Sequence, residues 1–221
     1  LKKLLDPPKI FIDLPFLKWI NLYMRFGMYR GKLLEKWFHQ KLQAKGICSF
    51  GDLPKGGLKL VASDLTNGKI LVLPDDLKNY GIDGNTFPIS RALRMSCGLP
   101  FFFEPAYLRN GKSESVIVDG GVLSNFPLWI FDNEKKVRPT LGMKLSSTSQ
   151  EMSPNEINNA IQLYEALFST MKNAHDNRYI ARRHEKDIIF IPVEKYNATQ
   201  FDMNEETKQK LMNIGKERTV K

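Results

Sequence analysis

One acidic residue, Asp119, stands where an apolar run, Val116 to Val118, meets the two glycines Gly120 and Gly121. An Asp-Gly pair of this kind is typical of a β-hairpin turn. The same residues could also place a carboxylate at the carboxyl end of a buried strand, where ligands bind in α/β sheets. A carboxylate at that place can act as a general base when a proton donor lies within hydrogen-bond reach. The local sequence leaves both interpretations open.

Other polar residues near these glycines are weaker candidates for chemistry. Ser96 and Ser124 lack the strand-to-helix elbow pattern of a serine nucleophile, so structural hydrogen bonding is expected for both. Cys97 stands in an apolar context and is expected to be buried. We expect Asp64 to stabilise the turn that follows it and not to take part in catalysis. No recognisable motif contains any of the three histidines, and no metal site or cofactor is predicted.

Two segments, ISRALRMSCGLPFFFEP at residues 89–105 and VDGGVLSNFP at residues 118–127, together resemble the patatin-like phospholipase family. The resemblance extends with looser agreement over residues 29–218, and residues 1–28 are a candidate cover over a groove. The residues that match the family's two central motifs are Ala92, Arg94, Ser96, Pro100, Phe103, Pro105, Asp119, Gly120, Gly121, Asn125 and Pro127.

The resemblance implies a Ser–Asp catalytic dyad that deacylates glycerolipids, with Asp119 as the partner of the serine. The motif residues Gly120, Gly121, Arg94, Pro100 and Asn125 would support it. The family's serine stands in a G-x-S-x-G motif after a glycine-rich oxyanion loop, and neither motif occurs in these 221 residues. The chain therefore resembles the C-terminal two-thirds of the domain, and the nucleophile is expected upstream of it.

Two other functions remain open at this stage. A catalytically inactive member of the family could bind a lipid or a partner through the same groove. A nucleic-acid binder of unrelated fold has only the positive charge in its favour, because no recognised binding motif appears, and no nucleic acid is expected as a partner.

The order of predicted elements indicates an α/β fold, in which strands and helices alternate along the chain. The resemblance narrows this to a three-layer α/β/α sandwich with a mainly parallel central sheet and its N-terminal part missing, in a single domain over residues 1–221. Helices are predicted over residues 32–45, 88–95, 154–184 and 204–218, with a helical turn over 127–131. Strands are predicted over residues 58–65, 69–73, 116–118, 140–145 and 188–192, with an Asn67-Gly68 hairpin turn between the first two.

The composition is that of a globular protein, with 42% hydrophobic and 26% charged residues. A net charge of +9 favours anionic partners, and peripheral association with an anionic membrane surface is expected, with membrane lipids or lipid esters as substrates. The two cysteines, Cys48 and Cys97, form no scaffold pattern and fit a reducing compartment, so a cytoplasmic location is predicted. The chain begins with Leu and shows no secretory leader.

Overall fold

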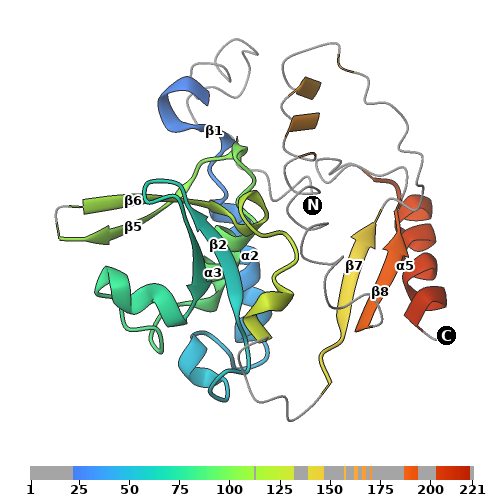
Figure 1. Ribbon diagram of the computed structural model, residues 1–221, viewed down its shortest axis with the longest axis horizontal. Coiled ribbons are helices and arrows are strands. Elements are labelled where there is room, and N and C mark those ends of the chain that lie inside the picture. Colours follow the sequence, from blue (N-terminus) through green and yellow to red (C-terminus); the bar gives the residue numbers. More distant parts are fainter. Residues whose placement is uncertain are drawn as a thin grey trace. The chain divides into compact units, whose positions relative to one another are not determined.

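The computed structural model describes residues 22–111, 113–131, 139–146, 157, 162–163, 166–167, 170, 187–193 and 203–219. The chain divides between residues 125 and 126 into two compact units, each of which is described by itself (Figure 1). The prediction of a single domain over residues 1–221 stays a prediction. Most of the candidate cover, residues 1–21, lies outside the described residues.

The described part of the first unit contains a helical turn at residues 22–25, two longer helices, six strands and several short 3-10 helices. Its longer helices are α2 (Lys32–Gln43) and α3 (Ile89–Ser96), and the 3-10 helices are η2 (Phe50–Asp52), η3 (Asp75–Tyr80) and η4 (Gly120–Val122). Its strands are β1 (Gly27–Tyr29), β2 (Leu60–Asp64), β3 (Lys69–Leu73), β4 (Phe101–Phe103), β5 (Ala106–Asn110) and β6 (Ser113–Asp119).

Local sequence explains the main boundaries of this unit. Gly31 precedes α2 with a φ of 73°, and Gly46 follows it with a φ of 72°, a backbone conformation that favours glycine at both ends. Gly68 adopts a φ of 60° in the turn between β2 and β3, which pair in antiparallel fashion from Leu60↔Leu73 to Asp64↔Lys69. The predicted helix at residues 32–45 and the predicted Asn-Gly hairpin are both confirmed.

The first unit's larger sheet has the strand order β3-β2-β6-β5, and every neighbouring pair in it is antiparallel. The separate pair β1–β4 is parallel. The α/β class is thus confirmed, whereas the four-stranded sheet differs from the mainly parallel arrangement that the sequence predicts. Connection length explains two of these pairs: β2 is joined to β3 and β5 to β6 by short turns, and parallel neighbours need a crossover of a dozen or more residues. The antiparallel pairing of β2 with β6 joins segments that are distant in sequence.

Helix α3 packs against β2 and β6, and α2 packs against α3, so both helices lie on the same side of the sheet (Figure 1). The sheet buries Ala62, Leu71 and Ile117 on this side. Strand alternation sends successive side chains to opposite faces, which places Asp119 on the same face as its cross-strand partner Ala62. The candidate residue therefore points to the helix-covered side.

The second unit contains η5 (Leu128–Phe131), β7 (Gly142–Ser146), β8 (Ile188–Pro192) and α5 (Glu205–Thr219). Strands β7 and β8 pair in parallel, from Gly142↔Ile188 to Ser146↔Pro192, and α5 packs on β8. These elements confirm the predicted strands and the final helix. Most of the predicted helix at residues 154–184 lies outside the described residues, although residues 162–163, 166–167 and 170 are helical.

A buried polar network closes the turn between β2 and β3. Asp64 is fully buried, and its carboxylate accepts hydrogen bonds from the backbone N–H of Asn67 (3.0 Å), the Asn67 side chain (2.6 Å) and the Tyr80 hydroxyl (2.5 Å). The Asn67 amide also donates to the hydroxyl of Ser115 at 3.0 Å. Burial acts to raise the pKa of Asp64, but the hydrogen bonds outweigh it and hold the pKa below its usual value. The predicted turn role of Asp64 is confirmed.

We expect Tyr80→Phe to lower the free energy of unfolding by about 2 kcal/mol near neutral pH, because it removes a hydrogen bond to a buried charge. Since the folded pKa of Asp64 is depressed, its contribution to stability is present above its unfolded pKa and is lost as the pH falls below about 4. The difference between wild type and variant should therefore shrink on acidification. Urea denaturation of the wild type and the variant, at neutral pH and below pH ~4, measures this difference in the free energy of unfolding.

Tyr107→Phe is the matched control, because the Tyr107 hydroxyl makes no hydrogen bond among the described residues. This control should change stability little at either pH. A Tyr80→Phe variant that is as stable as the wild type at neutral pH would contradict a stabilising Asp64–Tyr80 bond.

Candidate active site

Asp119 is the last residue of β6, and the chain turns directly after it into the 3-10 helix η4. Its side chain caps this helix, because the backbone N–H of Gly121 donates to Asp119 Oδ1 at 2.6 Å. The carboxylate is half-buried. No antiparallel strand follows the Asp-Gly pair, so the hairpin interpretation is wrong and the strand-end carboxylate is what the structure contains.

Gly120 makes the turn after Asp119 both tight and close to the sheet. A Cβ atom at this position would lie 2.3 Å from the carbonyl oxygen of Val61 in β2, so no larger residue fits without a shift. The Gly120 carbonyl accepts hydrogen bonds from the backbone N–H groups of Leu123 (3.2 Å) and Ser124 (2.8 Å). This backbone bonding holds Asp119 at a fixed orientation.

Arg94, in α3, is a buried charged residue with 4% of its surface exposed. Its Nη2 group donates to the backbone carbonyls of Arg30 at 3.2 Å and Glu104 at 2.5 Å. The guanidinium also lies 4.8 Å from the centre of the Phe103 ring, a cation–π contact. Arg94 thus joins α3 to the segment before α2 and to the segment after β4.

Two glycines make room for this guanidinium. A Cβ at Gly31 would lie 2.0 Å from Arg94 Nε, and one at Gly98 would lie 2.7 Å from Arg94 Nη1. The Gly98 carbonyl in turn accepts a hydrogen bond from the backbone N–H of Asp119 at 3.0 Å. The position of Asp119 therefore depends on Arg94 through one intervening residue.

The thiol of Cys97 lies in the electrostatic field of the same two groups. Burial raises its pKa to about 11; Arg94 opposes the rise and the negative charge of Asp119 adds to it. A thiol with this pKa is protonated at neutral pH, and a protonated thiol is a poor nucleophile. The site therefore offers a carboxylate base and no activated cysteine.

The structure brings together most of the residues that the sequence assigns to the site. Arg94, Gly120 and Gly121 all contribute to the position of Asp119, directly or through Gly98. Pro100 lies half-buried between α3 and β4, and Asn125 is exposed three residues after η4. The supporting role of these two residues in the site stays a prediction.

Sequence reasoning missed three positions that hold this arrangement. Gly31 and Gly98 accommodate the guanidinium of Arg94, and Glu104 supplies a carbonyl to it. The two glycines could have been flagged as sites of close approach, because a glycine outside a turn pattern often marks one. The Glu104 carbonyl carries no signal in the sequence, because every residue has one.

Comparison with known proteins assigns the chain to a protein family. A sequence model of the family described as patatin-like phospholipase matches residues 7–132, which include both central motifs. The uncharacterized protein YqhO of Bacillus subtilis (strain 168) is 50% identical over 218 residues, which are 99% of this chain and 75% of that relative. The chain belongs to the patatin-like phospholipase family, a family of lipid hydrolases.

No helix in the described part of the chain is long and apolar enough to cross a bilayer. Within the same residues, no group of three or more His, Cys, Asp or Glu side chains could hold a metal ion.

We expect Arg94→Lys to lower the free energy of unfolding by about 2–3 kcal/mol, because lysine lacks the planar guanidinium that lies over the Phe103 ring while its Nη2 group donates to two carbonyls. Arg91→Lys is the matched control on the same helix. Arg91 also donates to a carbonyl, that of Tyr107 at 3.0 Å, but it is exposed, so its replacement should cost less than about 0.5 kcal/mol. Equal losses in the two variants would show that Arg94 has no special role.

Gly120→Ala should destabilise the protein by about 1–3 kcal/mol, because the new methyl group overlaps the Val61 carbonyl. Gly215→Ala should do the opposite, raising stability by up to about 1 kcal/mol, because it lies within α5 with nothing near its Cβ position. Thermal denaturation of both variants measures the two changes in stability, which should have opposite signs. A neutral Gly120→Ala variant would mean that the turn after Asp119 is not sterically constrained.

Proposed function

We propose that the protein hydrolyses fatty-acyl esters of glycerolipids and phosphoglycerolipids by means of a Ser–Asp dyad in which Asp119 is the base. The observation that carries the proposal is the half-buried carboxylate at the end of β6. The carboxylate accepts a hydrogen bond from the Gly121 N–H, and the backbone N–H of Asp119 donates to the Gly98 carbonyl. Family membership supports the reaction class, and the serine would belong to a part of the protein outside these 221 residues.

The position of Asp119 suits a base for three physical reasons. Its half-burial lowers the local dielectric and so strengthens its interaction with a nearby proton donor. The hydrogen bond from Gly121 restricts the rotation of the carboxylate. The pairing of β6 with β2 and the close approach of Gly120 to Val61 restrict the backbone at Asp119, which keeps the carboxylate placed to receive a proton.

The proposed reaction has two balanced halves. The serine proton passes to Asp119 while the serine oxygen bonds to the ester carbonyl carbon, and the carbonyl oxygen takes the negative charge. When this intermediate collapses, the ester C–O bond breaks and the departing alcohol takes the proton from Asp119. Water then attacks the acyl-enzyme, with its proton passing to Asp119, and the fatty acid leaves as the serine regains a proton.

This scheme needs no histidine or metal ion. A carboxylate takes the part that histidine has in a triad, and orientation of the carboxylate replaces orientation of an imidazole. In this chain the backbone of the Gly120 turn provides that orientation.

We expect Asp119→Asn to lower kcat for fatty-acid release by about 10²–10⁴-fold, because an amide cannot accept the serine proton. The assay uses the complete protein, including its serine, with a phospholipid and with a nitrophenyl ester. Asp83→Asn is the matched control: Asp83 is exposed, and its carboxylate also accepts the backbone N–H two residues on, that of Asn85 at 3.0 Å. This control should keep full activity.

Circular dichroism and thermal denaturation establish that both variants remain folded. Unchanged turnover in a folded Asp119→Asn variant would remove Asp119 from the mechanism. A complete wild-type protein that releases no fatty acid from either substrate would instead support a catalytically inactive member of the family that binds lipid.

A further inference from the structure

Large apolar side chains are exposed at the N-terminal end of the described chain. Tyr23, Met24 and Phe26 have exposed fractions of 86%, 72% and 55%, and Phe101 has 48%. Leu33 and Trp37, on successive turns of α2, are also exposed. Single exposed apolar residues are ordinary, but a concentration of them marks an interaction surface. The β1–β4 pairing of Gly27 with Phe101 and the ion pair between Arg25 and Glu104 bring Tyr23, Met24, Phe26 and Phe101 to one region, and we call these four residues the docking surface.

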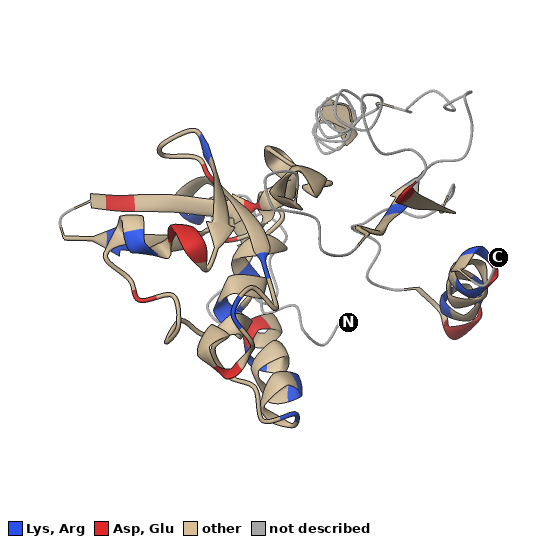
Figure 2. Cartoon of the chain, turned by 60° about the horizontal axis from the view of Figure 1, so that its bottom comes forward, with Lys and Arg blue, Asp and Glu red and all other residues tan. Residues whose placement is uncertain are grey.

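The same stretch of chain carries most of the excess positive charge. Residues 22–45 contain six basic residues and one glutamate, which gives +5 of the net +9 of the whole chain. Lys and Arg recur along this stretch in Figure 2. Apolar and aromatic side chains interspersed with basic ones are typical of segments that lie in the interface of an anionic bilayer.

Backbone strain falls on two residues of the docking surface. Phe26 and Phe101 have φ values of 61° and 62°, and no other described residue except glycine has a positive φ. The two lie next to each other, because Gly27 and Phe101 are partners in the parallel pair β1–β4. Bulky residues avoid this conformation, and strain of this kind concentrates at functional positions. In this protein the strained backbone is found at two phenylalanines whose side chains are exposed.

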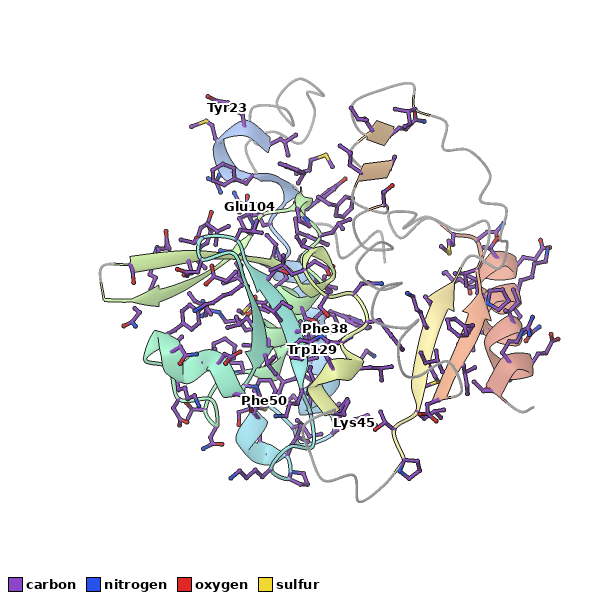
Figure 3. All side chains as sticks on the ribbon, viewed as in Figure 1. Tyr23, Phe38, Lys45, Phe50, Glu104 and Trp129 are labelled. Atoms are coloured by element: carbon purple, nitrogen blue, oxygen red, sulfur yellow. The ribbon has the colours of Figure 1, made fainter. Side chains whose placement is uncertain are left out.

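The docking surface is connected to the candidate active site by a short piece of chain. Phe101 lies three residues after Gly98, whose carbonyl accepts the backbone N–H of Asp119. The helical turn at residues 22–25 is held to the same region by an ion pair of 3.6 Å between Arg25 and Glu104. Figure 3 shows Tyr23 and Glu104 at the same end of the first unit.

We propose that the docking surface binds the protein to an anionic phospholipid bilayer, with the aromatic side chains in the interface and the basic side chains against lipid phosphates. The choice of lipid as the occupant rests on the proposed function, because an enzyme that cleaves membrane lipids must reach them at a surface. The charge of residues 22–45 favours an anionic bilayer over a neutral one.

Co-sedimentation with vesicles tests the proposal. The Asp119→Asn protein is used to prevent turnover, with phosphatidylcholine vesicles that contain or lack phosphatidylglycerol. We expect binding only to the anionic vesicles, weakened by salt. The double variant Tyr23→Ser, Met24→Ser should weaken this binding about tenfold or more, because two exposed apolar side chains no longer enter the interface. The matched control is Leu65→Ser, at a side chain of 47% exposure outside the docking surface, which should bind as before.

Phe26→Gly separates a docking role from a structural one. Glycine adopts a positive φ without strain, so the variant should have an unchanged or higher Tm and yet bind anionic vesicles more weakly. A fall in Tm with unchanged vesicle binding would mean that Phe26 serves the fold, and would overturn its part in docking.

Two other results would overturn the proposal as a whole. One is equal affinity for both vesicle types with no effect of the Tyr23, Met24 substitutions. The other is a concentration-dependent dimer, measured by light scattering, that the same substitutions dissociate, since the surface would then join two copies of the chain. Failure of the proposed function is distinguishable: it appears as an inactive complete protein on a soluble nitrophenyl ester, a substrate for which the docking surface is not needed.

Discussion

The first unit depends on one buried guanidinium. Arg94 binds the carbonyls of Arg30 and Glu104 and stacks on Phe103, so a single side chain joins three segments that are distant in sequence. A buried charge is costly unless it is fully bonded, and breaking such a set leaves the charge without compensation. The residues that surround Arg94 are constrained in turn, because Gly31 and Gly98 leave it the room it needs.

The position of Asp119 depends on this arrangement through Gly98. A comparison of Asp119 with Asp64 shows how the surroundings of two aspartates give them different roles. Both end strands that pair in the same sheet, and both side chains lie on its helix-covered face. Asp64 is fully buried and its carboxylate is bonded to the turn and to Tyr80, which suits a structural role. Asp119 is half-buried, its backbone N–H donates to the Gly98 carbonyl and its carboxylate accepts from the Gly121 N–H, so its orientation is fixed at the end of the strand.

Local patterns predicted the elements well where the signal lay within a few residues. The Asn67-Gly68 turn, the helix ended by Gly46, the strand at Ile188–Pro192 and the turn role of Asp64 are all present as predicted. The antiparallel direction of β2 and β3 follows from the predicted hairpin, but the antiparallel pairing of β6 with β2 and β5 was not predicted, because it depends on which segments pair in the fold. Gly98 and Glu104 were missed for a similar reason, since they act through backbone carbonyls that no side-chain pattern reveals.

The sequence alone determined the family and the identity of the candidate base, because the residue types and their spacing around Asp119 and Arg94 are specific enough to be recognised without coordinates. The residues next to Asp119 could not by themselves decide between a hairpin turn and a strand-end carboxylate, since an Asp-Gly-Gly sequence is compatible with both backbones, and only the resemblance favoured the second. The tertiary structure decided this point. The carbonyl of Val61 on the neighbouring strand excludes any side chain at Gly120, and the Gly98 carbonyl holds the Asp119 backbone, so long-range contacts select one conformation that local sequence leaves open.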